Sequence, residues 1–172
     1  MIHVVLYEPE IPQNTGNIMR TCMASGSVLH LIEPLGFQLD EKHLRRSGMD
    51  YRNELEYHTY PNWEAFVQAH PSENYYFVTR YGKVPPEAHD YQECEGDIYL
   101  IFGKESTGIP KELLAHHSDH CMRIPMVAKA RSLNLSNCVA IVVYEVLKQL
   151  DYPGLSKHEC IKGEDFLDQW KD

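Results

Sequence analysis

The sequence predicts a single α/β domain in which a parallel sheet is sandwiched between helices. The predicted strands are continuous apolar runs without polar alternation, which is typical of strands buried on both faces. Helical segments alternate with these strands along the chain, as they do when helices cover both sides of a parallel sheet. The length of 172 residues, with 43% hydrophobic and 24% charged residues, fits one domain of ordinary globular composition.

The first predicted element is a strand at residues 2–7, an apolar run at the very start of the chain. A helix follows it, and either Asn14 or Thr15 can cap this helix, because both side chains accept hydrogen bonds from free N–H groups at a helix start. The helix is expected to run to about Ser25. Gly26 ends it, since glycine readily takes the left-handed conformation found after helices.

A second apolar strand is predicted at residues 28–33. Asp40 can then cap a short basic helix at residues 41–46, and Asn62 can cap the next helix, at residues 63–69. Both caps are short polar side chains that stand directly before a helical pattern. The chain therefore continues to alternate between strand and helix.

Two further strands are predicted from apolar runs at residues 75–79 and 98–102. The stretch between them, residues 81–95, is acidic and contains prolines, which favours a loop. A short helix is expected at residues 110–116, because Pro110 fits the first turn of a helix.

A last short strand, at residues 121–124, precedes the longest predicted helix, at residues 135–150. This helix is apolar on more than one face, whereas a sheet covers only one stripe of a helix. The surplus predicts a homodimer through this helix, with Val143 and Tyr144 at the interface. The alternative is a helix buried deeply within a monomer.

We expect no targeting or membrane-spanning segment in this sequence. Its longest apolar run, residues 139–144, is far shorter than the roughly 18 residues that suggest a membrane span. The N-terminal run lacks the basic residues of a signal peptide. Five cysteines, odd in number and without CxxC spacing, indicate no disulfide framework. We therefore expect a cytoplasmic protein.

The net charge of −9 argues at first against a nucleic-acid partner, because phosphates bind cations. Basic residues nevertheless gather in two clusters, one within residues 42–52 and one within residues 104–131. One face can be positive while the whole molecule is negative. Composition alone favours the plainer interpretation that these are solvated surface charges.

Three segments are richer in Gly, Pro, Asn and Ser than ordinary connections, namely residues 9–20, 101–110 and 123–137. The first joins a strand end to a helix start, where backbone N–H groups bind anions. The second follows an apolar strand, where open α/β sheets bind ligands, and Gly103 there lets a ligand approach the backbone. It matches neither GxGxxG nor a Walker loop, so a dinucleotide or nucleoside-triphosphate site lacks its fingerprint.

These segments resemble the motifs of one enzyme family. PEIPQNTGNIMR is similar to motif one, IFGKESTGIP to motif two, and IPM followed by RSLNLSNCVAIVVYE to motif three of the knotted SPOUT superfamily of RNA methyltransferases, in its TrmH-like 2′-O-methylating branch. The resemblance runs from residue 1 to about residue 154 and leaves a tail at residues 155–172. The short length, with no RNA-binding domain expected, and the run LYEPEIPQNTGNIMR resemble most closely the short members that methylate the wobble cytidine or uridine of tRNA.

The resemblance implies a SPOUT domain at residues 1–154 with a deep C-terminal trefoil knot, which general fold rules would count as improbable. It implies tRNA as the substrate and S-adenosylmethionine as the cofactor, with S-adenosylhomocysteine as the product. Carried over to this sequence, the cofactor-binding residues are Thr79, Gly103, Ile124, Met126, Ser132 and Leu133.

The resemblance also implies that Arg20, Glu105 and Asn134 are catalytic. A ribose 2′-hydroxyl is a weak nucleophile and must lose its proton to react. The family assigns the base to Arg20, but arginine stays protonated up to a pKa above ~12, so a cationic Arg20 that aligns a phosphate and stabilises the forming alkoxide is an equal alternative. Phosphate contacts are expected at Arg45, Arg46, Lys104 and Arg131.

Two other functions stay open at this point. A related enzyme could act on ribosomal RNA, and a non-catalytic RNA-binding module could retain the fold, although it would then have no need of the three catalytic side chains. The run His116–His120 resembles a set of metal ligands. We expect no metal site, because no second cluster in the sequence completes one.

Overall fold

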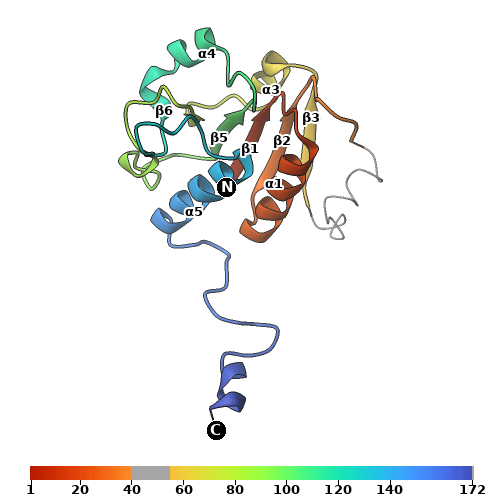
Figure 1. Cartoon of the computed structure of the whole chain (residues 1–172), viewed down its shortest axis with the longest axis vertical. Coiled ribbons are helices and arrows are strands. Elements are labelled where there is room, and N and C mark those ends of the chain that lie inside the picture. The colour runs from red at the N-terminus through yellow and green to blue at the C-terminus, as the bar shows by residue number, and fades with distance from the viewer. Residues whose placement is uncertain (40–54, 172) are drawn as a thin grey trace.

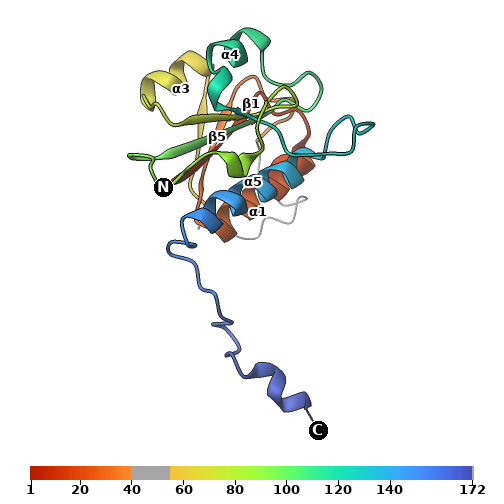
Figure 2. The same cartoon turned by 90° about the vertical axis from the view of Figure 1, so that its left-hand side faces the viewer.

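The computed structural model describes residues 1–39 and 55–171. In this part of the chain six parallel strands form one sheet, in the order β3-β2-β1-β5-β4-β6. The strands are β1 (Ile2–Tyr7), β2 (Val28–Ile32), β3 (Tyr57–Tyr60), β4 (Tyr75–Val78), β5 (Ile98–Gly103) and β6 (Cys121–Met122). The helices are α1 (Pro12–Ser25), α3 (Trp63–Ala69), α4 (Lys111–His116) and α5 (Leu135–Gln149), with 3₁₀ turns η1 (Pro86–Ala88), η2 (Ser118–His120) and η3 (Phe166–Trp170). Figure 2 shows α1 and α5 on one face of the sheet and α3 and α4 on the other, which confirms the predicted α/β sandwich.

Two apolar layers hold the helices to the sheet. Alternate residues of a strand point to opposite faces. Val4 and Leu6 of β1 accordingly join the core beneath α1 and α5, whereas Val5 joins the core beneath α3 and α4. All three side chains are fully buried. The continuous apolar pattern of this strand therefore reflects burial on both faces.

Local sequence signals set several element ends. The side chain of Asn62 accepts a hydrogen bond from the backbone N–H of Ala65 at 2.8 Å and caps α3, as predicted. Gly26 ends α1 in the left-handed region, with φ of +66°, also as predicted. At α5 the cap is Asn134, whose side-chain oxygen accepts from the N–H of Ser136 at 2.9 Å.

The start of α1 differs from the prediction. The helix begins at Pro12, and its N-cap residue Ile11 makes no side-chain capping bond. Asn14 and Thr15, the expected caps, are instead buried within the helix. Pro12 suits the first helical position because its φ is fixed and its missing N–H needs no partner there. Arg20 consequently lies about two turns into the helix.

The edge strand β3 is not predicted from the sequence. It runs parallel to β2, with Leu29 opposite Tyr57 and Ile32 opposite Tyr60. Most of β3 is exposed, so it lacks the apolar run by which the other strands are predicted. The predicted helix at residues 41–46, with its Asp40 cap, lies outside the described residues.

The apolar surface of α5 is mostly used within the single chain. The helix packs beside α1 on the sheet (Figure 1), and Val143 is fully buried there. The expectation that Val143 lies at a dimer interface is therefore wrong, because this side chain faces the core. Ile141 and Tyr144 remain 46% and 43% exposed and form the apolar surface that α5 presents outward.

After α5 the chain leaves the body as an extended tail that ends in η3 (Figure 1). The sequence does not predict this 3₁₀ turn. Two of the tail's apolar side chains, Ile161 and Trp170, are 94% and 64% exposed. Within the described residues, no helix combines the length and the apolar character that a membrane crossing requires.

Candidate functional site

Segments far apart in the sequence meet at the carboxyl edge of the sheet. The loops after β4, β5 and β6, together with the first turn of α1, enclose a cavity of about 630 Å³. Open α/β sheets bind their ligands at this edge. The predicted site residues that line the cavity are Thr79, Gly103, Lys104, Glu105, Ile124, Met126, Arg131, Ser132, Leu133 and Asn134.

Of the predicted site residues that the structure describes, Arg20 is not part of this lining. Arg20 is exposed on α1, beyond the first turn that borders the cavity. Arg45 and Arg46 lie outside the described residues, so the structure does not place them. The cavity of one chain thus contains the cofactor residues that the sequence predicts, but not the predicted motif-one arginine.

Glu105, from the loop after β5, holds the loop that precedes α1. Its carboxylate accepts hydrogen bonds from the backbone N–H groups of Glu10 at 2.9 Å and Ile11 at 3.1 Å. It also accepts from the side-chain amide of Asn14 at 3.4 Å. Both oxygens therefore position the motif-one loop.

Glu10 makes the reverse connection. Its carboxylate accepts from the backbone N–H and from the hydroxyl of Ser106, each at 2.8 Å. These two hydrogen bonds lower the pKa of Glu10 below its usual value. Each of the two loops thus supplies a carboxylate that accepts hydrogen bonds from the other loop. These bonds fix the two loops relative to each other beside the cavity.

Asn134 connects motif three to motif one. Its side-chain oxygen caps α5, and its side-chain nitrogen donates to the side-chain oxygen of Asn14 at 2.9 Å. Asn14 in turn donates to Glu105, so one buried amide links all three motifs. Sequence reasoning names Asn14 only as a helix cap. Because Pro12 can start the helix without a capping side chain, Asn14 lies inside the first turn, and its amide is free for another role.

The reason for glycine at position 103 differs from the expected one. Gly103 has a φ of +106°, a region that favours glycine. An added Cβ would meet the carbonyl oxygen of Tyr7, on the neighbouring strand, at 2.7 Å. Gly103 is therefore required first by the packing of β5 against β1, before any ligand is considered.

Lys104 is less available to phosphate than the sequence implies. Its ammonium group forms an ion pair with the carboxylate of Glu8, and this hydrogen bond raises the pKa of Lys104. A phosphate at this position would have to share the lysine with Glu8. The pair ties the end of β5 to the end of β1.

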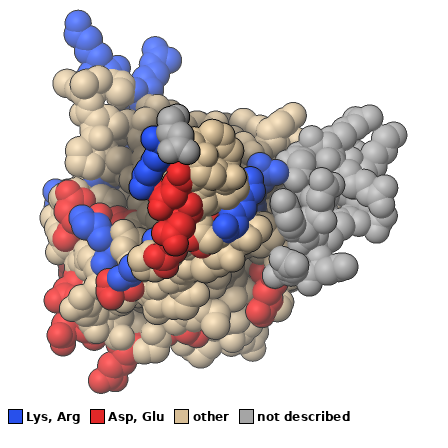
Figure 3. Space-filling model, turned by 90° about the horizontal axis from the view of Figure 1, so that it is seen from below, with Lys and Arg blue, Asp and Glu red and all other residues tan. Residues whose placement is uncertain are grey.

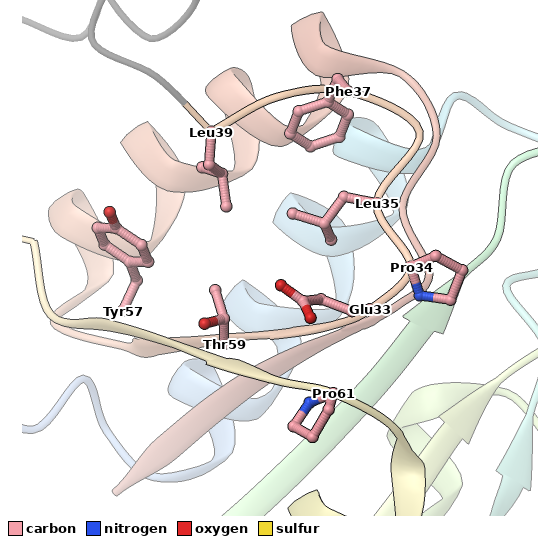
Figure 4. Close-up of a pocket in the computed structure, with 8 residues that line it drawn as sticks. All are labelled: Glu33, Pro34, Leu35, Phe37, Leu39, Tyr57, Thr59 and Pro61. Carbon is pink, nitrogen blue, oxygen red and sulfur yellow. The ribbon is translucent and has the colours of Figure 1, made fainter.

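A second cavity of about 670 Å³ lies at the ends of β2 and β3 (Figure 4). Leu35, Phe37 and Leu39 point from the loop after β2 toward Glu33 and Thr59. None of the predicted site residues within residues 1–39 and 55–171 lines it. The first cavity is thus the candidate site, because the three motifs converge there.

Two histidines of the 116–120 run, His117 and His120, pack against aromatic side chains of β4, whereas His116 is exposed. The ring of His117 stacks on Phe77 with centroids 4.8 Å apart, and the ring of His120 stacks on Tyr76 at 5.0 Å. Across residues 1–39 and 55–171, no group of three or more His, Cys, Asp or Glu side chains is arranged to hold a metal ion.

Comparison with known proteins adds a family and several relatives. The SpoU rRNA methylase family matches residues 1–144. The tRNA (cytidine(34)-2′-O)-methyltransferase of Escherichia coli strain K12 is 46% identical over 155 residues, covering 90% of this chain and 97% of that protein.

Solved structures are similar over the same region. One, concerned with the 2-OH methylation of C/U34 on tRNA, has a TM-score of 0.79 and 39% identity and covers 88% of this chain and 97% of its own. An AdoMet-bound rRNA methyltransferase from Sinorhizobium meliloti has a TM-score of 0.75 and 26% identity and covers 87% of this chain and 56% of its own. These findings confirm the resemblance that the three motifs carry. This chain belongs to the SpoU rRNA methylase family.

Proposed function

We propose that this protein transfers the methyl group of S-adenosylmethionine to the ribose 2′-hydroxyl of the wobble cytidine or uridine of tRNA. The single observation that carries the proposal is the cavity at the carboxyl edge, where all three motifs of a 2′-O-methyltransferase supply side chains. The relatives that act on position 34 of tRNA support the choice of substrate, since they match this chain over almost their whole length.

The cavity suits S-adenosylmethionine in size and chemistry. Its volume of about 630 Å³ lies within the range of small-molecule sites. Leu133 is 38% exposed at the cavity, and together with Ile124 it offers an apolar surface that an adenine ring would cover. Ser132 and the loop backbone supply hydrogen-bonding groups. The bound cofactor supplies a methyl group on a sulfonium. We assign Thr79, Gly103, Ile124, Met126, Ser132 and Leu133 to hold it.

The catalytic side chains divide into positioning and reacting groups in this proposal. Glu105 fixes the motif-one loop, and Asn134 fixes the start of α5 while keeping an amide hydrogen toward the ribose. Arg20 binds the phosphate of the target nucleotide and either stabilises the forming alkoxide or takes the proton of the 2′-hydroxyl. Arg131, at the cavity, adds a second phosphate contact.

We also propose a homodimer through the outward face of α5. The support is the pair of exposed apolar side chains, Ile141 and Tyr144, on a helix whose valines and Leu147 are buried. Exposed apolar side chains adjoining one another are typical of association surfaces.

The remaining expectations concern the chain as a whole. We propose that residues 1–154 form the methyltransferase domain, that its C-terminal part is tied in the trefoil knot, and that the enzyme works in the cytoplasm. The support for the knot is that the loops after β4, β5 and β6 lie around one cavity, and that the start of α5 borders the same cavity.

The test is nucleoside analysis of RNA from a strain that lacks the protein. We expect the wobble ribose of one or more tRNAs to lose its 2′-O-methyl group, and purified protein with S-adenosylmethionine to restore it. Loss of a methyl group from ribosomal RNA instead would support the ribosomal alternative. Binding of RNA by the purified protein without any methyl transfer would support the non-catalytic module.

A further inference from the structure

Basic side chains surround one exposed tyrosine at the rim of the cavity. Tyr81, in the turn after β4, is 57% exposed. The guanidinium carbon of Arg80 lies 5.9 Å from the centroid of its ring, and the ammonium nitrogen of Lys111 lies 5.6 Å from it. Arg80, Tyr81 and Arg123 all line the cavity. The turn after β4, the start of α4 and the end of β6 thus bring three cations to the neighbourhood of one aromatic ring.

The turn that carries Tyr81 is held in place. The backbone N–H of Tyr81 donates to the hydroxyl of Thr79 at 3.3 Å, and Nη1 of Arg123 donates to the carbonyl oxygen of Arg80 at 2.8 Å. Gly82 lies so close to β6 that an added Cβ would come within 2.3 Å of its backbone. A surface that is ordered before its ligand arrives loses less entropy on binding.

These cations are not neutralised within the described part of the chain. Over residues 1–39 and 55–171, none of Arg80, Lys111 and Arg123 forms an ion pair with Asp or Glu. The chain carries a net charge of −9, and charges of both signs are interspersed over the face seen in Figure 3. A basic cluster without acidic partners in an acidic protein attracts anions locally.

We propose that Tyr81 stacks on an unpaired base of the RNA substrate beside the methylated nucleotide, while Arg80 and Lys111 hold the phosphates that flank this base. This inference rests on the proposed function, because the RNA must enter the cavity that Tyr81 borders. Proteins bind single strands by combining aromatic rings, which stack on bases, with cations along the backbone. Bases within a duplex are already stacked on their neighbours, so the platform selects loops over paired RNA.

The experiment measures the binding of two labelled RNAs by fluorescence anisotropy. One is a hairpin with an anticodon-like loop, and the other is a blunt duplex of the same length. We expect Tyr81→Ala to weaken hairpin binding about tenfold and to leave duplex binding unchanged. Tyr81→Phe keeps the ring and is expected to bind both RNAs as the wild type does.

The variants that remove a positive charge are expected to change RNA binding in a different way. Lys111→Ser and Arg80→Ser should weaken the binding of both RNAs. They should also lower the slope of log Kd against log salt concentration, by about 0.7 to 0.9 for each phosphate that the protein no longer neutralises. The tail provides a matched control, because Lys162 lies 4.6 Å from the centroid of the Phe166 ring, far along the chain from the cavity. Lys162→Ser and Phe166→Ala should change neither affinity.

The outcomes separate this inference from the proposed function. If the wild type methylates tRNA but Tyr81→Ala binds the hairpin as tightly as the wild type, the stacking platform is overturned and the enzyme assignment stands. Equal losses on hairpin and duplex would also overturn it. If the wild type methylates no tRNA yet its preference for the hairpin depends on Tyr81, the platform stands and the proposed function fails. Should Tyr81→Ala unfold, Tyr81→Leu, which also removes the aromatic ring, carries the same comparison.

Discussion

At the scale of single residues, Asn14 shows why an amide is needed between the three motifs. It donates to a carboxylate, Glu105, and accepts from another amide, Asn134, while only 6% exposed. An aspartate at this position could accept but not donate, and its charge would lie beside that of Glu105. Buried polar groups that lose a partner cost more than the average hydrogen bond contributes. The geometry therefore favours asparagine.

Arg20 is the residue on which the proposed chemistry depends most. Arg20→Ala should leave the affinity for S-adenosylmethionine within a few-fold, because Arg20 does not line the cavity. It should remove methyl transfer to purified tRNA, measured at saturating RNA so that weak binding does not pass for lost chemistry. Near-normal turnover by this variant would remove Arg20 from the catalytic residues.

Arg20→Lys separates the two roles left open for this residue. If Arg20 only neutralises a phosphate, lysine keeps the charge and should retain substantial turnover. If forked contacts or proton acceptance are needed, lysine should be nearly as inactive as alanine, since the two cations are not interchangeable at such contacts.

A second residue-scale feature is a row of hydrogen-bonded side chains that contains two buried histidines. It lies on the face of the sheet that α3 and α4 cover. Nδ1 of His3 lies 2.8 Å from Nε2 of His30, and Nδ1 of His30 lies 3.0 Å from the hydroxyl of Tyr60. His30 is fully buried. Burial is the largest cause that lowers the pKa of His30 to about 3, and the charges of His3, His70 and His58 contribute to the lowering.

This shift predicts a loss of stability in mild acid. The unfolded chain binds a proton at His30 below about pH 6.5, whereas the folded chain does not until about pH 3. The contribution of His30 is therefore fully present above pH 6.5 and is lost as the pH falls, by about 2 kcal/mol at pH 5. Urea unfolding at pH 7 and pH 5 measures it.

The controls isolate His30. In His30→Phe, the drop in unfolding free energy between the two pH values should be smaller by about the same amount. His116 is exposed, so His116→Gln should retain the full drop. A drop in His30→Phe equal to that of the wild type would contradict the assignment.

At the scale of elements, α5 has two apolar faces with different uses. Tyr144→Asp should yield a folded monomer, because it places a charge on the outward face where a partner copy would bury it at a cost of several kcal/mol. Light scattering at micromolar concentration measures the mass. Val143→Asp is the matched contrast, since this side chain is fully buried within one chain and its replacement should unfold the protein. A wild type that is monomeric at micromolar concentration would refute the dimer.

At the scale of the whole molecule, the body and the tail differ in how firmly they are packed. Tyr152 and Leu155 still pack against the core, whereas most of the chain beyond them is exposed. The structural body thus ends close to the proposed domain boundary at residue 154. Residues further along the tail can add little to the stability of the body.

Truncation tests this division. Ending the chain after Ser156 keeps Tyr152 and Leu155 and should leave the melting temperature and the affinity for S-adenosylmethionine unchanged. Ending it after Asp151 removes both apolar side chains and should lower the melting temperature by several degrees, at about 2–4 °C for each kcal/mol of stability. Differential scanning calorimetry distinguishes the two. Equal melting temperatures for both truncations would show that the two side chains add no stability.

Apart from the edge strand β3, the sequence by itself determined the strands of the described sheet and most of its helices, and its three motif segments line the candidate cavity. Continuous apolar strands, a capping asparagine at Asn62 and a terminal glycine at Gly26 act over a few residues, and so can be identified locally. The three motifs could be recognised because each is a continuous segment. The edge strand β3 could not be predicted, since its exposed side chains form no apolar pattern.

Only the tertiary structure decided how the motifs hold one another. The hydrogen bonds of Glu105 with Glu10 and Ile11, and of Asn134 with Asn14, join residues about a hundred positions apart, and no local pattern encodes such pairs. The same holds for Gly103, whose glycine is required by Tyr7 on the adjacent strand, and for Val143, whose burial depends on what α5 packs against. Side-chain chemistry along the chain gives each segment its own conformation, but the distance between segments is set by folding.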